Sequence, residues 1–307
     1  MTRTREDCYA KRVLGATCGE GSMGPLLLDR VAFVTGAGAG IGRAIACRFA
    51  EEGADIAAVD IDGPAAEETA ALVRAVGRRA EAIRADVANI HDVESAAQQA
   101  WTAFGRIDVL VNNAGITRDA TIPEMSEADW DLVIDVHLKG TFLCTSAIGP
   151  RMRDAGRGVI VNMSSVSGKI GNIGQANYSS AKAGMVALTK VTAREFAPYG
   201  IRANAIQPGL ISTPPTLARG EEKLREGAAG TPLGRIGTPD EVASVALFWP
   251  VIWRVSSPAP SSRSRADGTC DPSDPLGALP HASTSQGAGA QATDQPPLNG
   301  HKSEHRG

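Results

Sequence analysis

The feature that most constrains the fold is an alternation of short apolar runs with helical stretches, which begins at Arg30 and continues to Phe248. The apolar runs of strand length are VAFVT, DIAAVD, AEAIRAD, IDVLVNN, GVIVNMSS and IRANAIQP. Helices are predicted between them, near residues 41–52, 64–76, 90–103, 126–153 and 176–197. Strands that alternate with helices imply right-handed crossovers and a parallel sheet covered on both faces. The sequence therefore predicts an α/β, doubly wound, three-layer fold of the Rossmann type, which binds ligands at the carboxyl edge of its sheet.

Both ends of the chain differ in character from this alternating region. Residues 1–22 are polar and aperiodic, so we predict either a disordered leader or a true start at Met23. Residues 23–248 form the expected Rossmann domain. Residues 249–307 are rich in Pro, Ser, Gly and Ala and show no regular period, so they are predicted to be disordered.

Composition and charge argue against several classes of partner. The 307 residues carry a formal net charge of −3, and the 31 basic residues form no dominant cluster, so no nucleic-acid partner is expected. The 5 cysteines are scattered without C-x-x-C spacing, which indicates neither a disulfide framework nor a zinc site and suits a reducing cytoplasm. No apolar stretch reaches the length that spans a membrane. We therefore expect a cytoplasmic protein that binds neither a metal nor a membrane.

A glycine-rich loop, TGAGAGIG at residues 35–42, lies where the first strand meets the first helix. Glycines allow a tight turn there and let a pyrophosphate approach the amides at the helix N-terminus. The residues expected to contact a dinucleotide in this loop are Gly36, Gly40, Ile41 and Gly42. The strand before the loop, the helix after it and an acidic residue further on favour a cofactor site over a turn that needs glycine for geometry alone.

That acidic residue, Asp60, ends the second predicted strand. A carboxylate at this place accepts hydrogen bonds from the hydroxyls of an adenosine ribose and repels a 2′-phosphate. The loop residues Ala37, Gly38 and Ala39 offer no basic group in compensation. NAD(H) is therefore preferred over NADP(H). In the alternative interpretation Asp60 caps the following turn, and both roles can coexist.

A tyrosine and a lysine stand four positions apart in ANYSSAKAG, at Tyr178 and Lys182. On a helix they share a face, about one turn apart. An ammonium about 4 Å from a phenol is worth about 4 kcal/mol at an effective dielectric of about 20, which lowers the phenol pKa by about three units at most. Tyr178 is then able to act as a general acid or base near neutral pH. The alternative is an exposed tyrosine that packs on a lysine stem.

Taken together, the motifs resemble those of the short-chain dehydrogenase/reductase family. They stand in family order as TGAGAGIG, ADV, NNAG, NMSS, YSSAK and QPGLIST, and the resemblance runs from about Leu28 to Leu247. NNAGITRD and GNIGQANYSSAKAG are especially similar to bacterial 3-oxoacyl-[acyl-carrier-protein] reductases and related 3-hydroxyacyl-thioester dehydrogenases. The resemblance implies metal-free hydride transfer between a nicotinamide and a carbonyl or secondary alcohol, with a small-molecule substrate and a homo-oligomeric enzyme.

The resemblance also assigns roles to single residues. Ser165, rather than its neighbours Ser164 and Ser167, would polarise the substrate carbonyl, and Lys182 would hold the nicotinamide ribose as well as lower the pKa of Tyr178. Two of the further assignments have a structural alternative, which is turn formation for Asp86 and support of the central strand for NNAG. The further cofactor-binding positions are Asp86, Val87, Asn113, Ala114, Gly115, Pro208, Gly209, Ile211 and Thr213.

One position departs from the family pattern inside the helix predicted near 126–153. The family usually has an asparagine there, within N-x-x-G, whereas this chain has DVHLKG with His137. An imidazole can donate and accept hydrogen bonds and has a pKa near neutrality, so His137 is a candidate for a proton relay. The alternative is that it packs beside the sheet. No second His or Cys lies at ligand spacing, so it is not expected to bind a metal.

A second departure follows Phe248, where the family continues with a short loop and a last strand. This chain reads WPVIWRVSSPAPSSRSRADGT instead, so that strand is missing from the sequence as printed. Synonymous codons exist for which the same stretch, read from the last base of the Phe248 codon, encodes LASDLASFVTGAVIAVEGG. We therefore hypothesise a frameshift, in the gene or in its sequencing. If the shifted chain is real, an alternative function is that of a non-catalytic dinucleotide-binding remnant.

The frameshift hypothesis predicts what the nucleic acid will show around codon 248. Resequencing of the genomic DNA and of the mRNA should reveal an inserted or deleted base that brings LASDLASFVTGAVIAVEGG into frame with Phe248. An uninterrupted frame that reads WPVIWRVSS in the mRNA would contradict the hypothesis.

Overall fold

The computed structural model describes residues 24–256, and its centre is a parallel six-stranded sheet with the strand order β3-β2-β1-β4-β5-β6. The strands are β1 (Val31–Thr35), β2 (Asp55–Asp60), β3 (Ala80–Arg84), β4 (Val109–Asn112), β5 (Gly158–Met163) and β6 (Ile201–Ile206). All six lie within the predicted apolar runs, because the buried strands of a parallel sheet carry nearly continuous apolar sequence. The predicted Rossmann-type α/β fold is confirmed.

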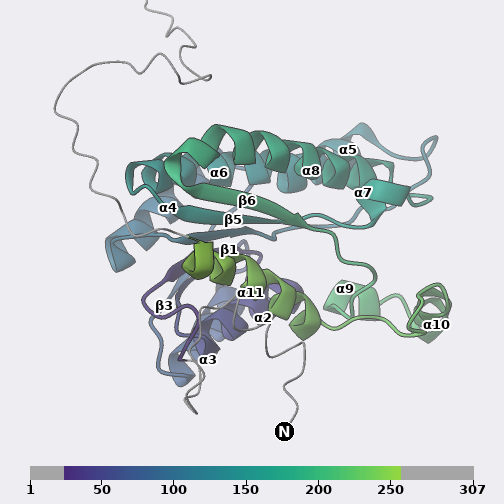
Figure 1. Cartoon of the computed structure of the whole chain (residues 1–307). Helices are drawn as coiled ribbons and strands as arrows, with labels where there is room; N and C mark the ends of the chain where they lie inside the picture. The colour runs from purple at the N-terminus through teal and green to yellow at the C-terminus, as the bar shows by residue number, and fades with distance from the viewer. Residues whose placement is uncertain (1–23, 257–307) are drawn as a thin grey trace, which may run out of the picture. The chain divides into compact units, whose positions relative to one another are not determined.

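Helices cover both faces of the sheet, as the prediction of three layers requires (Figure 1). The helices are α2 (Gly40–Glu51), α3 (Gly63–Ala75), α4 (Ile90–Phe104), α5 (Glu127–Ile134), α6 (Gly140–Asp154), α7 (Ser167–Ile170), α8 (Ala176–Phe196), α9 (Pro214–Leu217), α10 (Glu221–Ala229) and α11 (Pro239–Ser256). On one face α2, α3 and α11 bury Phe49, Val73 and Ala246 against the strands. On the other face α4 and α6 bury Val93 and Ile148.

The helix predicted near 126–153 contains an interruption that the sequence did not reveal. Residues Asp135–Lys139 form a π-helical turn, η1, between α5 and α6, and His137 lies in this turn. A π turn holds one extra residue and changes the direction of the side chains that follow, which is why such turns occur often at functional sites. His137, which differs from the residue usual in the family, therefore lies in the turn where the helix is irregular.

The same segment bears on the question of a membrane. Within residues 24–256, the stretch Glu127–Asp154 has the length and apolar composition of a membrane-spanning helix, and half of its apolar window is buried inside the fold. The expectation that no stretch reaches that length is therefore corrected. Leu143, Ile148 and Met152 of this stretch pack into the core under the sheet, so its apolar character is weak evidence for a membrane.

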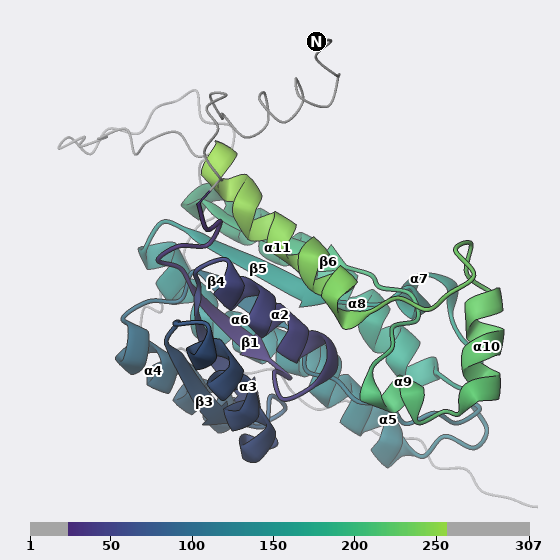
Figure 2. The ribbon, with the colours of Figure 1, turned by 90° about the horizontal axis from the view of Figure 1, so that it is seen from below.

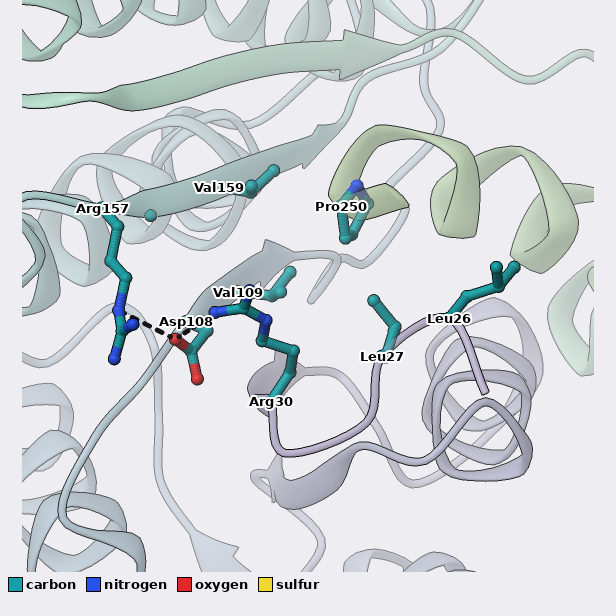
Figure 3. A pocket seen from close by; sticks show the side chains of 9 residues that line it. Leu26, Leu27, Arg30, Asp108, Val109, Arg157, Val159 and Pro250 are labelled. Carbon is teal, nitrogen blue, oxygen red and sulfur yellow. Dashed lines mark hydrogen bonds and ion pairs between the residues drawn. The ribbon is translucent and has the colours of Figure 1, made fainter. Parts of the chain in front are cut away.

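At the amino edge of the sheet one buried carboxylate joins three strands. The carboxylate of Asp108, just before β4, accepts a hydrogen bond from the Val31 backbone N–H at 3.0 Å. It also pairs with Arg30 at 3.4 Å, with Arg157 at 3.6 Å and with Arg106. Figure 3 shows this carboxylate between Arg30 and Arg157, beside a pocket that all three residues line. The starts of β1, β4 and β5 are thereby fixed relative to one another.

Helix α11 continues past the predicted end of the domain at residue 248 and reaches Ser256. This corrects the boundary, because the predicted disordered segment began at residue 249. Pro250 lies inside the helix, where it has no backbone N–H to donate. Arg202 of β6 donates a hydrogen bond to the Trp249 backbone carbonyl at 2.5 Å, which holds this part of α11 against the sheet. The predicted leader, and the tail from residue 257 onward, lie outside the described residues.

Candidate functional site

The predicted site residues follow the carboxyl ends of the strands, at one edge of the sheet. The glycine loop follows β1, the NNAG segment follows β4, Ser165 follows β5 and Pro208 follows β6. The short helices α9 and α10 stand beyond the same edge in Figure 1, at the arrowheads of β5 and β6. The pocket of Figure 3 lies at the opposite edge and contains none of the predicted residues.

The glycine loop is tightly folded at the start of α2. Gly36 and Gly40 have φ angles of +63° and +54°, in the region that favours glycine. At Gly42 a Cβ atom would overlap the Gly36 carbonyl oxygen and lie 2.6 Å from the Asn113 Nδ2 atom. The residue before the helix, Ala39, provides no side-chain cap, so the first amides of α2 are donors for an anion. This loop fits the pyrophosphate of a dinucleotide.

The NNAG segment holds the glycine loop in place. The Asn113 side-chain amide donates to the carbonyls of Thr35 at 3.0 Å and Gly36 at 3.1 Å. In return the Thr35 hydroxyl accepts from the Asn113 backbone N–H at 3.0 Å and from the Ala114 backbone N–H at 3.1 Å. The structural interpretation of NNAG is thus confirmed, since these residues join the ends of β1 and β4.

Asp60 lies beside the glycine loop and makes two local hydrogen bonds. Its carboxylate accepts from the Gly38 backbone N–H at 2.8 Å and from the Asp62 backbone N–H at 3.0 Å. The turn-capping role proposed for Asp60 is therefore present. The sequence suggested no basic group here, but Arg43 lies against the loop, with its guanidinium 2.5 Å from the Gly38 carbonyl oxygen. Arg43 also pairs with Glu68 at 2.8 Å, which offsets its charge.

Tyr178 and Lys182 lie together, as their spacing predicted, and Ser165 lies beside them, as the family resemblance implied. Tyr178 lies on the first turn of α8, and the Lys182 Nζ atom is 5.5 Å from the centre of the tyrosine ring, on the same side of the helix. Ser165 lies close enough to the Tyr178 hydroxyl to act on the phenol pKa, which it lowers. Ser165 is 8% exposed, and its Oγ atom accepts from the Ser167 backbone N–H at 3.1 Å. Ser164 points elsewhere and donates to the Lys182 carbonyl at 2.7 Å.

The electrostatic argument for Tyr178 needs correction. Lys182 is 3% exposed, and burial lowers its pKa to about 7. Near neutral pH, only part of the population therefore carries the charged ammonium. Its Nζ atom donates to the Met163 carbonyl at 2.5 Å. Burial raises the pKa of Tyr178, and the interaction with Ser165 only partly opposes this. The prediction assumed a charged ammonium and left out the burial of both groups, whereas desolvation is the larger effect here.

His137 is buried against this cluster. Its Nε2 atom lies 2.7 Å from the Ile116 carbonyl oxygen and 3.1 Å from the Ile116 backbone N–H. Its ring meets the Tyr178 ring edge to face, with the ring centres 5.1 Å apart. Burial, aided by the nearby Lys182, lowers the pKa of His137 to about 3, so the imidazole is neutral. The Nδ1 atom has no hydrogen-bond partner among the described residues. The ring has packing contacts and also a free nitrogen, so both interpretations of His137 stay open.

Three further predicted cofactor-binding residues, Asp86, Val87 and Pro208, make contacts within the fold. The Asp86 carboxylate accepts from the Ala88 backbone N–H at 2.9 Å, which is the turn-forming alternative. Val87 is buried beside Gly140. The Pro208 carbonyl accepts from the Val166 backbone N–H at 3.0 Å, next to Ser165.

The segment after Pro208 reaches the glycine loop. Ile211 pairs with Gly237, and Thr213 lies 3.4 Å from the position of a Cβ atom at Gly40. At Gly209, no other atom lies within 4 Å of the position that an added Cβ atom would take. This segment is therefore placed to cover a ligand bound at the loop.

Sequence reasoning missed a polar network that positions the first turn of α8. The fully buried Asn177 accepts from the Tyr178 backbone N–H at 2.7 Å and donates to the carbonyls of Arg118 at 3.0 Å and Asp129 at 3.2 Å. Gln175 donates to Asp119, which also pairs with Arg219 at 3.6 Å. The charges of Asp119 and Arg219 act in opposite directions on the pKa of Tyr178. The sequence feature that could have indicated this network is the number of amide side chains in GNIGQANY.

Comparison with known proteins agrees with this geometry. The sequence profile of the family described as short chain dehydrogenase matches residues 30–223. The (3R)-3-hydroxyacyl-CoA dehydrogenase of Mus musculus is 46% identical over 231 residues, which cover 72% of this chain and 89% of the mouse protein. The 3-oxoacyl-[acyl-carrier-protein] reductase FabG of Thermotoga maritima is 44% identical over 222 residues, which cover 72% of this chain and 90% of that protein. The crystal structure of levodione reductase superimposes with a TM-score of 0.70 at 36% identity, over 73% of this chain and 91% of that one.

The contact between Gly115 and His137 predicts a coupled pair of substitutions. A Cβ atom at residue 115 would overlap the His137 Cε1 atom, so Gly115→Ala should lower the free energy of unfolding by about 1–3 kcal/mol. In the His137→Asn background the same change should cost at least about 1 kcal/mol less, because the smaller side chain leaves room. Urea denaturation of the four proteins measures this coupling. Gly209→Ala, at an uncrowded glycine, is the control, and additive effects would contradict the contact.

The lowered pKa of His137 predicts a pH dependence of stability. Between about pH 3 and pH 6.5 the unfolded chain binds a proton at residue 137 that the folded chain does not, so acidification destabilises the fold. Between pH 6.5 and 4.5 the free energy of unfolding of the unmodified chain should therefore fall by about 2 kcal/mol more than that of His137→Asn. Urea titrations at several pH values test this, with the exposed His91→Asn as control. Parallel profiles for the chain and His137→Asn would show that the imidazole is not buried in its neutral form.

Proposed function

The chain belongs to the short-chain dehydrogenase family, and from this membership we propose that it transfers a hydride between NAD(H) and a carbonyl or secondary alcohol, with Tyr178 as the proton donor or acceptor. The observation that carries the proposal is that Tyr178 and Ser165 lie together at the carboxyl edge, with the buried Lys182 one helical turn from Tyr178. A dinucleotide would supply the redox chemistry, while this chain supplies position and one proton.

The protonation states of the three residues suit the reduction of a carbonyl. The raised pKa of Tyr178 keeps the phenol protonated near neutral pH, ready to donate to a developing alkoxide. Ser165 is placed to share a hydrogen bond with the same oxygen and so to orient it. Lys182, with a pKa of about 7, is able to return a proton toward the phenol, because it exchanges protons readily at neutral pH. In the direction of alcohol oxidation the same tyrosine must first lose its proton, so that direction should gain from alkaline pH.

The proposal of a dinucleotide cofactor rests on the residues that follow the carboxyl ends of β1 and β4. The uncapped amides of α2 face the space where a pyrophosphate would lie, and Thr213 closes over Gly40. Asp60 already accepts from two backbone amides, and its free lone pairs are placed for the ribose hydroxyls. Arg43 is a basic group against the loop, and Glu68 offsets its charge. The balance favours NAD(H) over NADP(H).

A 3-oxoacyl thioester is the proposed substrate class. The relatives named for 3-hydroxyacyl-CoA and for 3-oxoacyl-acyl-carrier groups support it. So do the exposed apolar side chains on the segments around the carboxyl edge, which would shield an acyl chain from water. These side chains are Ile122 at 78% exposure, Ile173 at 99%, Leu217 at 52% and Leu233 at 79%.

The second candidate is a dinucleotide-binding remnant without turnover, favoured by the altered sequence after Phe248. NADH fluorescence during titration, followed by NADH oxidation with acetoacetyl-CoA, separates the two. Binding with turnover supports the enzyme, and binding without turnover in a soluble preparation supports the remnant.

Replacement of Tyr178 tests the proton-transfer role. Tyr178→Phe should lower kcat with acetoacetyl-CoA by about 10²-fold or more, because no other hydroxyl takes over the proton transfer. NADH affinity, measured by fluorescence titration, should stay within about twofold, since the ring is retained. Tyr199→Phe, at an exposed tyrosine on η2 (Ala197–Tyr199), is the matched control and should behave as the unmodified chain. Full activity in Tyr178→Phe would refute the assignment.

Replacement of Asp60 tests the cofactor preference. Asp60→Ala removes the charge that repels a 2′-phosphate and leaves Arg43 beside the loop. The ratio of kcat/KM for NADH to that for NADPH should fall by about tenfold or more. Glu68→Ala, which frees Arg43 without touching Asp60, should lower the ratio less. An unchanged ratio in Asp60→Ala would show that Asp60 serves the turn alone.

A further inference from the structure

The pocket at the amino edge of the sheet combines arginines with apolar side chains. Of the nine described residues that line it, Arg30 and Arg157 are basic and Asp108 is the one acid. The others are Leu26, Leu27, Val109, Gly158, Val159 and Pro250. None of these nine residues belongs to the proposed catalytic or cofactor site, so the pocket is a separate candidate site.

One carboxylate oxygen in this pocket faces three guanidiniums. The Asp108 Oδ1 atom lies 3.4 Å from Arg30 and 3.6 Å from Arg157, and it also pairs with Arg106. The pKa of Arg30 is lowered, first by burial, and the charges of Arg106 and Arg157 add to this while Asp108 opposes it. Among these four side chains positive charge exceeds negative charge, so a second anion placed beside them is attracted.

Arg157 has hydrogen-bond donors that a second anion can use. Its side chain is 41% exposed, and its Nε atom lies 3.6 Å from Asp108, which is longer than a hydrogen bond. It makes no side-chain hydrogen bond with the described part of the chain. A guanidinium presents its N–H donors in a planar fork that matches the two oxygens of a carboxylate.

The interior of the pocket is apolar and narrow. Val109 and Val159 are buried, and helix α11 packs beside α2 and against β5 and β6, as Figure 2 shows, so that it brings the buried Pro250 to the same place. The enclosed space is about 10 Å³, about the room that one water-sized group needs. A methyl group suits such a space, whereas a charged group there would lose its water without a polar replacement.

We propose that this pocket binds a short aliphatic monocarboxylate. Its carboxylate lies on the guanidiniums of Arg30 and Arg157, and its methyl end enters the apolar interior between Val109 and Val159. Arg30 precedes β1 and Arg157 precedes β5, so the bound carboxylate joins the starts of two strands that are not neighbours in the sheet.

The experiment adds propionate to the full chain at constant ionic strength, with sodium chloride as the balancing salt. Saturation-transfer NMR of the propionate methyl group measures binding, and we expect a Kd of about 1–10 mM for so small a ligand. Thermal unfolding provides an independent readout. The Tm should rise by about 3–5 °C at a propionate concentration about ten times its Kd.

Two further compounds test the class of ligand. Propionamide has the same shape without the charge, and inorganic phosphate has the charge without the methyl group. Each should bind at least about tenfold more weakly than propionate, because each lacks one of the two contacts.

Substitutions in the chain test the place of binding. Arg157→Gln should weaken propionate binding by about tenfold or more, and Arg157→Lys, which keeps the charge but loses the planar fork, should weaken it less. Arg153→Gln is the matched control, because Arg153 is an exposed arginine that pairs with Asp154 and does not line the pocket. If Arg157→Gln does not fold, Arg157→Lys decides the place of binding.

Three outcomes would overturn the proposal. An equal response to propionamide would show that the arginines do not bind the ligand, and an equal response to phosphate would show that the apolar interior is not used. Binding that is unchanged by substitution of Arg157 would place propionate elsewhere, including beside Tyr178. All readouts are of binding and stability, so they do not depend on whether the chain turns over a substrate.

Discussion

The hydrogen bonds between Thr35 and Asn113 are the interaction on which the site depends. They join the carboxyl ends of β1 and β4, the place where the strand order reverses and where a doubly wound sheet opens into a crevice. The same asparagine holds the Gly36 carbonyl, and Gly42 packs on that carbonyl, so α2 starts at a fixed distance from the crevice. At the opposite edge, Asp108 fixes the starts of β1, β4 and β5. The strands are therefore set at both ends.

Burial, more than charge, governs the proton chemistry of the site. Lys182 lies in the interior with one carbonyl partner, and this lowers its pKa toward neutrality, while the same loss of water raises the pKa of Tyr178. The two pKa values consequently move apart, so a proton passes favourably from the Lys182 ammonium to a phenolate at Tyr178. His137 stays neutral and adds no charge here, while the charges of Asp119 and Arg219 act on the pKa of the phenol in opposite directions.

Much of the fold was predictable because its signals are local. Strand runs, the glycine loop and the Tyr178–Lys182 spacing depend on a few neighbouring residues, and each was found where the sequence placed it. The π turn at His137 was missed because it depends on packing against Ile116 and Tyr178, which lie far away in sequence. The direction of the tyrosine pKa was wrong for a similar reason, since burial is a property of the assembled fold. The continuation of α11 to Ser256 was missed because the composition after residue 248, rich in Pro and Ser, shows no helical period.

The crowding of His137 against Gly115 has a consequence for how this site can change over generations. While the imidazole is present, every side chain at residue 115 meets a ring that cannot withdraw, because the ring is held between Ile116 and Tyr178. A lineage that first exchanges the histidine for a smaller residue opens position 115 to drift, whereas the reverse order passes through a crowded intermediate. The order of mutation is thus imposed by a steric contact, and descendants that keep the ring are expected to keep the glycine.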